Sequence, residues 1–315
     1  MKTKHPYCLI LSFAILYLSS CQKESSVERG VVVPVVNNLV GDSNYLDKII
    51  YTSTVGNIID TVFTQIYQYD ASKRVVSLID STKSTSSISE NQTIKYFYNG
   101  NDTLPFKKVE TFCNLNTMQA TSNKDTSISF YQYSITGTKI KDSILNFSHH
   151  LNVNGSGNDY VNFYKEIINY EYSQNMIYGK SIKTITYSNT NPNLGSSKIY
   201  DTAMIDFLGN IIINKKYDDS NVLFLTSNFT YDTKPNPFAR LSNYKTITVF
   251  PSGETFIDQM QAKNNRLKAV EIGNGLGSNN DLTGKYQYNL NGYPKQIIET
   301  DPMVIYKITF IYRSL

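Results

Sequence analysis

The sequence predicts an all-β fold: one large antiparallel meander of hairpins that is strongly curved or barrel-like. Strand-like segments with two aromatic residues at alternating positions recur along the chain, and each is followed by a turn-forming residue. Tyr is very abundant, at 25 of 315 residues, and Tyr, Ile and Thr suit a pleated, half-buried surface. The helix formers Ala and Glu are sparse. A two-sheet sandwich is the alternative that these observations leave open.

The first element is a predicted signal peptide over residues 1–20. Lys2 and Lys4 precede an apolar run, CLILSFAILYL, that is too short to cross a bilayer, which takes about 20 residues. The run ends at Leu18-Ser19-Ser20-Cys21, which resembles the lipobox of bacterial lipoproteins. That resemblance implies cleavage before Cys21 and a diacylglycerol on its sulfur, and two or more acyl chains make a stable membrane anchor.

The second element is a polar tether over residues 21–40, which contains a short Val-rich segment that we expect to form an edge strand. Gln22, Lys23 and Glu24 follow the lipidated cysteine directly, and they are similar to the surface-export signals of Bacteroidetes-type lipoproteins. The resemblance implies an outer-membrane, lipid-anchored protein facing outward. A position on the periplasmic face is the alternative.

The third element, residues 41–315, is predicted to be one β-rich domain made of hairpins. The alternation places both aromatic residues of each Tyr-x-Tyr on one face of its strand. Tyr160–Tyr172 fits a short helix and a strand about equally, and Ile308–Tyr312 alternates as a closing strand. The aromatic segments and the second strands that follow them are 66–70 with 74–76, 96–100 with 108–109, 131–134 with 139–140, 170–173 with 182–183, 229–232 with 240–241, and 286–289 with 295–297.

The repeated segments, the block Phe229–Phe238 and the stretch Tyr288–Pro294 resemble domain-of-unknown-function lipoproteins of Bacteroidetes, which have a porin-like, large β-sheet fold. The unit is also similar to the tyrosine–aspartate (YD) repeats of RHS-type surface proteins. The repeats here are too few and too uneven to build the closed shell of the RHS proteins, and a fixed period is lacking. The resemblance implies class and location but supplies no catalytic residue.

Charge and cysteine content exclude several classes. The net charge is +4, and the basic residues are dispersed singly along the strands, so no patch for nucleic acid is expected. Cys8 leaves with the signal and Cys21 is lipidated, so Cys113 has no partner for an intramolecular disulfide. A barrel inserted in the membrane is disfavoured, because a lipid anchor would be redundant and lipid-facing strands should be more uniformly apolar.

The sequence motifs predict no catalytic residue, no metal site and no cofactor site. Gly273–Gly277 resembles a fragment of a phosphate loop, but Ser278–Asp281 follows and continues a turn, where a dinucleotide site would open a helix. His149 and His150 should diverge on a strand, and Asp218-Asp219 is more consistent with a turn than with a calcium loop. The tyrosines could stack on sugars, but core and cross-strand packing is the favoured interpretation.

These observations predict a non-enzymatic, lipid-anchored envelope protein, most simply a surface-exposed binding or structural module for a glycan or another surface ligand. The first alternative is a periplasmic scaffold or assembly partner of an outer-membrane complex. The second is a glycan-acting hydrolase, which needs two carboxylates at a set separation. The expected partners are therefore the outer membrane, through the anchor, and a glycan or an envelope protein.

Overall fold

The computed structural model describes residues 45–55, 58–82, 88–116, 121–152, 160–173, 175–188, 195–238, 263–273, 280–300 and 305–315. The predicted signal peptide, tether and export signal, with Cys21, Gln22, Lys23 and Glu24, lie outside these residues. No helix long and apolar enough to cross a bilayer occurs in the described part of the chain.

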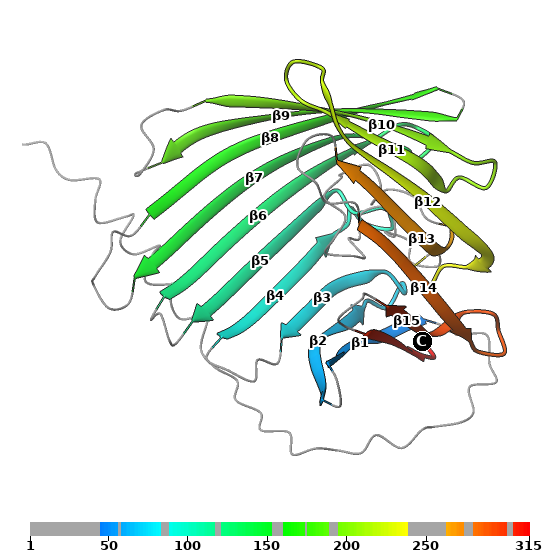
Figure 1. Ribbon diagram of the computed structural model, residues 1–315. Helices are drawn as coiled ribbons and strands as arrows, with labels where there is room; N and C mark the ends of the chain where they lie inside the picture. The colour runs from blue at the N-terminus through cyan, green and yellow to red at the C-terminus, as the bar shows by residue number, and fades with distance from the viewer. Residues whose placement is uncertain are drawn as a thin grey trace, which may run out of the picture. The chain divides into compact units, whose positions relative to one another are not determined.

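The described residues form a closed barrel of antiparallel strands (Figure 1). Each strand pairs with its neighbours in sequence, and β1 pairs with β16 to close the wall, with Ile49 opposite Phe310. The strands are β1 Tyr45–Val55, β2 Ile58–Tyr69, β3 Val75–Thr82, β4 Ile88–Phe97, β5 Lys107–Asn116, β6 Thr121–Tyr133, β7 Lys139–Asn152, β8 Tyr160–Ser173, β9 Met176–Ser188, β10 Ser196–Ile205, β11 Ile211–Tyr217, β12 Leu223–Pro235, β13 Asn264–Gly273, β14 Asn280–Tyr288, β15 Pro294–Thr300 and β16 Ile305–Arg313.

The predicted all-β, barrel-like meander is confirmed, and the two-sheet alternative is wrong because the sheet closes on itself. The ambiguous segment Tyr160–Tyr172 is part of strand β8, paired with β7 and β9. Its β-branched and aromatic residues favour the pleated conformation, and neighbouring strands on both sides satisfy its backbone groups. The predicted closing strand is β16.

The two ends of the barrel differ. One end, the short-turn end, carries the start of β1, the end of β16 and the turns at 70–74, 98–106, 134–138, 206–210 and 289–293. The other end, the loop end, carries the turn at 218–222 and connections that are largely outside the described residues.

One turn geometry recurs at both ends. In the turn at 70–74, the Asp70 Oδ1 accepts the backbone N–H groups of Ser72 and Arg74, both at 2.9 Å, and Lys73 takes a positive φ of 61°. This is a short loop closed by a bulge, and the strand register shifts beside it. The turns that share this geometry begin at Asp70, Ser134, Asp206, Asp218 and Asn289, with positive φ at Lys73, Gly137, Gly209, Asn221 and Gly292.

The second tyrosine of most aromatic pairs ties its strand to the start of the preceding strand. The Tyr98 hydroxyl, just past β4, donates to the Val75 carbonyl at 2.7 Å, and Tyr172 of β8 donates to the Lys139 carbonyl at 2.8 Å. These bonds cross from one hairpin to the next at the short-turn end. The residues of this tyrosine belt are Tyr69, Tyr98, Tyr133, Tyr172, Tyr231, Tyr286 and Tyr312, which donate to Leu46, Val75, Pro105, Lys139, Ile211, Arg266 and Pro294.

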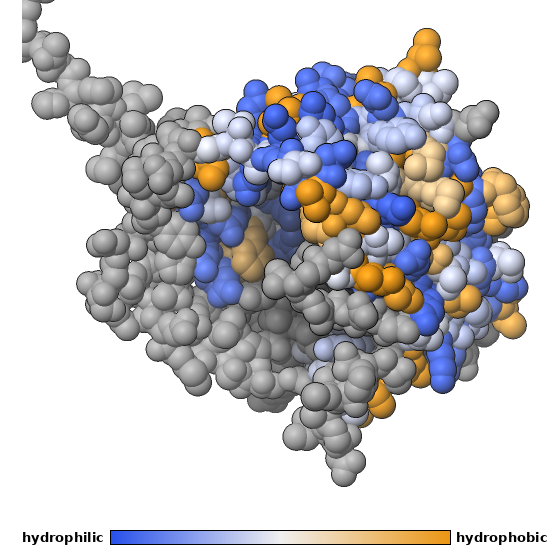
Figure 2. All heavy atoms as spheres, turned by 45° about the horizontal axis from the view of Figure 1, so that its top comes forward, coloured by the Kyte–Doolittle hydropathy of each residue, from blue (hydrophilic) through white to orange (hydrophobic). Residues whose placement is uncertain are grey.

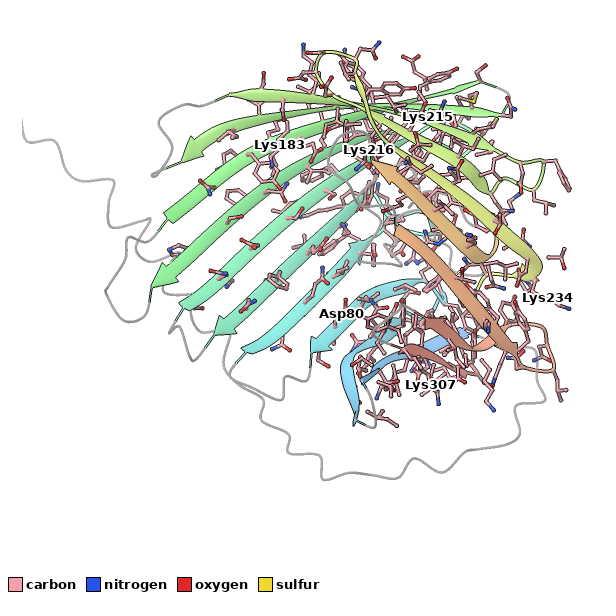
Figure 3. The ribbon with its side chains drawn as sticks, viewed as in Figure 1. Asp80, Lys183, Lys215, Lys216, Lys234 and Lys307 are labelled. Atoms are coloured by element: carbon pink, nitrogen blue, oxygen red, sulfur yellow. The ribbon has the colours of Figure 1, made fainter. Side chains whose placement is uncertain are left out.

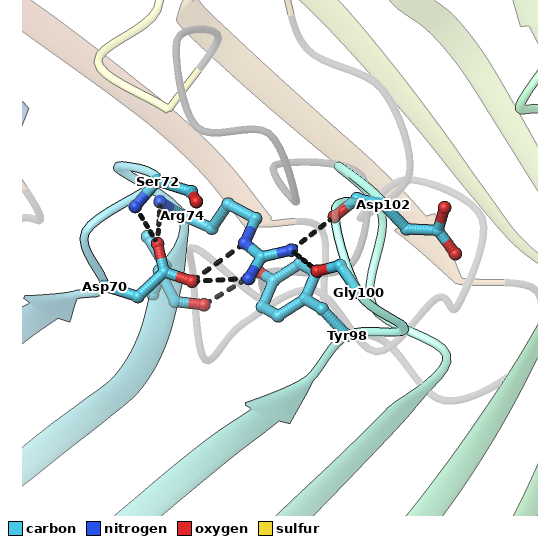
Figure 4. Close-up of polar contacts among 7 residues, drawn as sticks. Asp70, Ser72, Arg74, Tyr98, Gly100 and Asp102 are labelled. Atoms are coloured by element: carbon cyan, nitrogen blue, oxygen red, sulfur yellow. Dashed lines mark hydrogen bonds and ion pairs between the residues drawn. The ribbon is translucent and has the colours of Figure 1, made fainter.

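Arg74 adds a second tie between two of these hairpins (Figure 4). Its Nε and Nη2 both reach Asp70 Oδ2 at 2.8 Å. Its Nη1 donates to the carbonyls of Gly100 at 2.7 Å and Asp102 at 2.8 Å, and its guanidinium lies 4.5 Å from the ring centre of Tyr98. A planar guanidinium can meet all of these partners at once, which a lysine ammonium cannot.

The apolar core lies on the inner wall of the barrel toward the short-turn end. Tyr67 of β2, Leu46 and Ile49 of β1 and Ile308 of β16 are almost fully buried there. Phe238, just past β12, joins this cluster, with its ring centre 6.4 Å from that of Tyr67. Because β2 and β12 are not neighbours in the wall, this contact bridges separate parts of the barrel.

Candidate functional site

Beyond the apolar core, the inner wall carries a band of polar side chains. Directly paired residues share a face, so the register defines this band from strand to strand. Gln65 lies opposite both Ile49 of the core and Asp80, which fixes Asp80 on the inner face. The inner polar band comprises Gln65, Asp80, Gln92, Lys108, Glu110, Asp142, Glu166, Ser181, Lys183, Asp201, Asn214, Lys216 and Ser227.

One part of the band is a chain of amides and carboxylates over β2–β5. Gln65 Nε2 donates to Asp80 Oδ2 at 3.2 Å. Gln92 donates to Glu110 Oε1, and Lys108 Nζ lies 2.8 Å from Glu110 Oε2. Asp80 and Glu110 therefore belong to strands on either side of β4, which carries Gln92.

The surroundings shift these two carboxyl groups in opposite directions. Burial raises the pKa of Asp80 to about 7, the hydrogen bond from Gln65 lowers it and the negative charge of Glu110 raises it further. Burial also raises the pKa of Glu110, but the charge and hydrogen bond of Lys108 outweigh it, so that pKa lies below its ordinary value. Asp80 is thus a candidate proton donor beside an ionised Glu110 near neutral pH.

A second part of the band is a buried ion pair on β7. Lys139 Nζ lies 3.0 Å from Asp142 Oδ2, which also accepts the Tyr170 hydroxyl at 2.8 Å. The ammonium sits over the rings of Tyr131 and Tyr170, 5.2 and 5.3 Å from their centres. Burial holds the pKa of both tyrosines well above the ordinary value, so their hydroxyls stay neutral. The charges of Lys139 and Asp142 compensate each other, which favours a structural role for this cluster.

A third part lies on β8–β12. Ser181 donates to Glu166, and Lys183 Nζ lies 3.9 Å from the ring centre of Tyr164. Asn214 and Ser227 are opposite each other on β11 and β12 and almost fully buried, and within the described residues their side chains make no hydrogen bond. Buried polar groups normally have partners, so this pair is an exception to the usual pattern within the inner polar band.

The outer wall has a different composition. Lys215 and Lys216 (Figure 3) are consecutive on β11 and therefore face opposite sides of the wall, Lys215 outward and Lys216 inward. Thr, Asn and Gln alternate with single apolar residues on this wall, and the surface in Figure 2 shows hydrophilic and hydrophobic residues interspersed. The outward lysines are Lys48, Lys95, Lys107, Lys124, Lys141, Lys165, Lys180, Lys198, Lys215, Lys268, Lys285 and Lys307.

The residues singled out in the sequence fall at separate places. Asp218 closes a turn, accepting the backbone N–H groups of Ser220 and Val222 at 2.9 Å, as expected. His149 is exposed on β7, opposite Lys124 of β6, and Cys113 is half-buried on β5, opposite the same lysine. Most of Gly273–Gly277 lies outside the described residues.

The aromatic pairs were predicted to pack in the core and across strands, and the first residue of most pairs is buried there. The hydroxyls of the tyrosine belt donate to backbone carbonyls. This leaves no tyrosine platform among the belt residues. The inner polar band was missed, because sequence alone does not show which carboxylates meet. A usable signal was a polar residue two positions before some of the aromatic pairs, as Gln65 precedes Tyr67 and Ser227 precedes Phe229.

No protein-family model matches the chain, and no curated protein is significantly similar to it. Among solved structures, a porin-like protein from Bacteroides vulgatus is similar at 11% identity and a TM-score of 0.42, covering 86% of this chain and 100% of that one. A porin-like protein from Bacteroides uniformis is similar at 12% identity and a TM-score of 0.36, covering 86% and 99%. Likenesses this distant carry no argument about function.

Proposed function

We propose that this chain is a non-enzymatic, lipid-anchored envelope protein whose barrel stands in water beside the membrane and serves as a binding or structural module. The single observation that carries the proposal is the outer wall. Lysines face outward on most strands, among them the exposed Lys95, Lys165, Lys180, Lys198, Lys285 and Lys307.

An outer wall of this kind is unsuited to lipid. A barrel that spans a bilayer presents a continuous apolar band outward, and a lysine at the midplane costs about 2–4 kcal/mol. Lys180 is the fifth of the 13 residues of β9, with Asn169 of β8 beside it and the Tyr200 ring 5.7 Å from its Nζ. Water, rather than acyl chains, is the solvent that such a wall fits.

The inner wall supports the same conclusion. Its buried cluster of Leu46, Ile49, Tyr67 and Ile308 is an apolar core of the type found in water-soluble domains. A barrel with its apolar core inside and its lysines outside needs another means of membrane attachment. The lipobox-like segment ending at Cys21 supplies that means.

The test is extraction of membranes from cells that make the full chain. Wild-type protein should stay in the membrane pellet through an alkaline carbonate wash, while Cys21→Ala, which cannot be lipidated, should appear in the wash as a folded barrel. Cys113→Ala is the matched control, because it removes a cysteine without touching the anchor. A Cys21→Ala protein that has lost residues 1–20 and still stays in the carbonate-washed pellet would show that the barrel itself is inserted and would refute the proposal.

Orientation and partner are parts of the same proposal. The similarity of Gln22, Lys23 and Glu24 to export signals supports outward display, where a glycan or other surface ligand is the partner. Protease shaving of intact cells, with a periplasmic protein as the control, tests this. Digestion with the control intact is the expected outcome, and protection until the outer membrane is opened would favour the periplasmic scaffold instead.

The hydrolase alternative has one observation in its favour, the opposite pKa shifts of Asp80 and Glu110 on the inner wall. It predicts release of reducing sugar from envelope glycans, abolished by both Asp80→Asn and Glu110→Gln. If wild-type protein binds glycan without cleaving it, the non-enzymatic assignment stands. Glycan cleavage by the wild-type protein that both variants abolish would replace the non-enzymatic assignment with that of a hydrolase.

A further inference from the structure

The recurring turn places an exposed side chain at its second position. At the short-turn end this position is apolar: Ile135, Phe207 and Leu290 are 105%, 95% and 104% exposed, and Ala71 occupies the equivalent place. At the loop end the same turn has Asp219 there. The turn geometry therefore does not require an apolar residue at this position. Single exposed apolar residues are ordinary, but here they recur at one turn position and one end of the barrel.

The three large apolar tips are spread around the end of the barrel. They join β6 to β7, β10 to β11 and β14 to β15, so the first and second, and the second and third, are four strands apart, and the three tips span half of the circumference. Side chains spaced in this way cannot cover one another or form a local core. They could all be buried together only against a broad surface that meets the whole end.

Charge at this end fits an anionic surface. Lys73, Lys234, Lys263 and Lys295 are all exposed at the short-turn end. Of the acids described there, Asp70 and Asp206 accept the backbone N–H groups of their own turns, and Asp232 accepts those of Lys234 and Asn265. Asp47 is paired with Arg313 at 3.2 Å, and Asp102 and Glu171 are exposed. Lysines beside projecting apolar side chains are the combination that binds the headgroup region of anionic bilayers.

The point at which the anchor segment joins the barrel is also consistent with a bilayer at the short-turn end. The barrel begins at Tyr45, the first residue of β1, which lies at the short-turn end. The segment that links Cys21 to the barrel therefore joins it at the same end as the apolar tips. Attachment at this end lets the short-turn end meet the bilayer while the loop end points away from it.

We propose that the short-turn end of the barrel docks on the bilayer surface, with Ile135, Phe207 and Leu290 dipping into the lipid interface and the loop end directed away from the membrane. This rests on the lipid anchoring proposed above and adds an orientation to it. The inner polar band would then be reached from the loop end.

The experiment uses the absence of tryptophan from the chain. Ile135→Trp, Phe207→Trp and Leu290→Trp each place one fluorophore at a tip, and Asp219→Trp is the matched control, at the same turn position of the other end. The full lipidated proteins are reconstituted on vesicles of phosphatidylethanolamine and phosphatidylglycerol with brominated acyl chains. Tip emission should shift to the blue and lose intensity, while the Asp219→Trp emission should match that of protein in water.

Emission at all three tips that matches water, or quenching at Asp219→Trp alone, would overturn the docking proposal while leaving the anchor intact. Phe147→Trp, which is exposed on the outer wall well inside β7 and away from the short-turn end, separates the two proposals. Quenching there as well would mean that the wall itself is in lipid, which would refute the water-exposed barrel. The triple variant Ile135→Asp, Phe207→Asp, Leu290→Asp is expected to fold, because Asp219 already occupies this turn position. On vesicles, protease should cleave this variant at the short-turn end, where the wild-type protein is protected.

Discussion

The Tyr69 hydroxyl, at the end of β2, donates a 2.6 Å hydrogen bond to the carbonyl of Leu46, at the start of β1. The same relationship links Tyr312 of β16 to Pro294 of β15 at 2.7 Å. Each bond satisfies a backbone carbonyl near a strand end and places a ring over the inner wall. The aromatic repeat in the sequence therefore corresponds to a series of hydrogen bonds that link neighbouring strands at the short-turn end.

Tyr69→Phe removes one bond of the tyrosine belt and keeps the ring. We expect the free energy of unfolding to fall by about 1 kcal/mol, the usual net value of one such hydrogen bond. Tyr178→Phe is the matched control, because Tyr178 is 43% exposed on the outer wall. Urea denaturation of both variants checks this, and equal effects from the two changes would mean that the belt hydroxyl contributes nothing specific.

Arg74→Lys tests the tie between the hairpins that begin at β2 and β4. Lysine keeps the charge beside Asp70 but cannot also reach the carbonyls of Gly100 and Asp102. We expect a loss of about 1 kcal/mol and faster amide exchange at residues 98–106, measured by hydrogen exchange. Unchanged exchange in that turn would contradict the role assigned to the guanidinium.

Phe238→Ala tests the bridge from the end of β12 to Tyr67 of β2. The ring is almost fully buried, so its removal leaves a cavity and should cost about 3–5 kcal/mol. Phe224→Ala, on the outer face of β12, removes the same atoms from an exposed place and should cost far less. Thermal or urea unfolding compares the two, and similar losses would show that Phe238 does not bridge the wall.

The sequence was sufficient for the class of fold and for many of its hairpins. The alternation of Tyr67 and Tyr69 before Asp70 marked a strand and its turn, because period-two aromatics and a side-chain acceptor are local signals. The sequence did not decide between a strongly curved sheet and a closed barrel. Closure depends on the pairing of β1 with β16, whose residues are far apart in the chain.

The candidate site was harder to predict for the same reason. Asp80 and Glu110 look like ordinary strand acids in the sequence, and only the register through Gln92 sets them on one inner face. The outward lysines were seen only as single dispersed charges. That these lysines all face outward becomes evident only when the inner and outer faces of each strand are known, and the closed barrel defines those faces.

The carboxyl group of Asp80 makes the free energy of unfolding depend on pH, and the sign of this dependence follows from its pKa shift. Its pKa is about 7 in the folded protein, against 3.8 for an unperturbed aspartate, chiefly because burial disfavours the charged form. A raised folded pKa means that the native state binds a proton the unfolded chain has released. The contribution of this group is therefore fully favourable below pH 3.8 and is lost as the pH rises through about 7.

Asp80→Asn removes this titration while keeping an oxygen that can accept from Gln65. The measurement is the difference in unfolding free energy between variant and wild type across this pH range, since other titrating groups cancel in the difference. The variant should gain stability relative to wild type as the pH rises, and the gain should level off above about 7. A difference that stays constant with pH would mean that Asp80 ionises normally in the folded barrel, and the inner polar band would then be hydrated like an open surface.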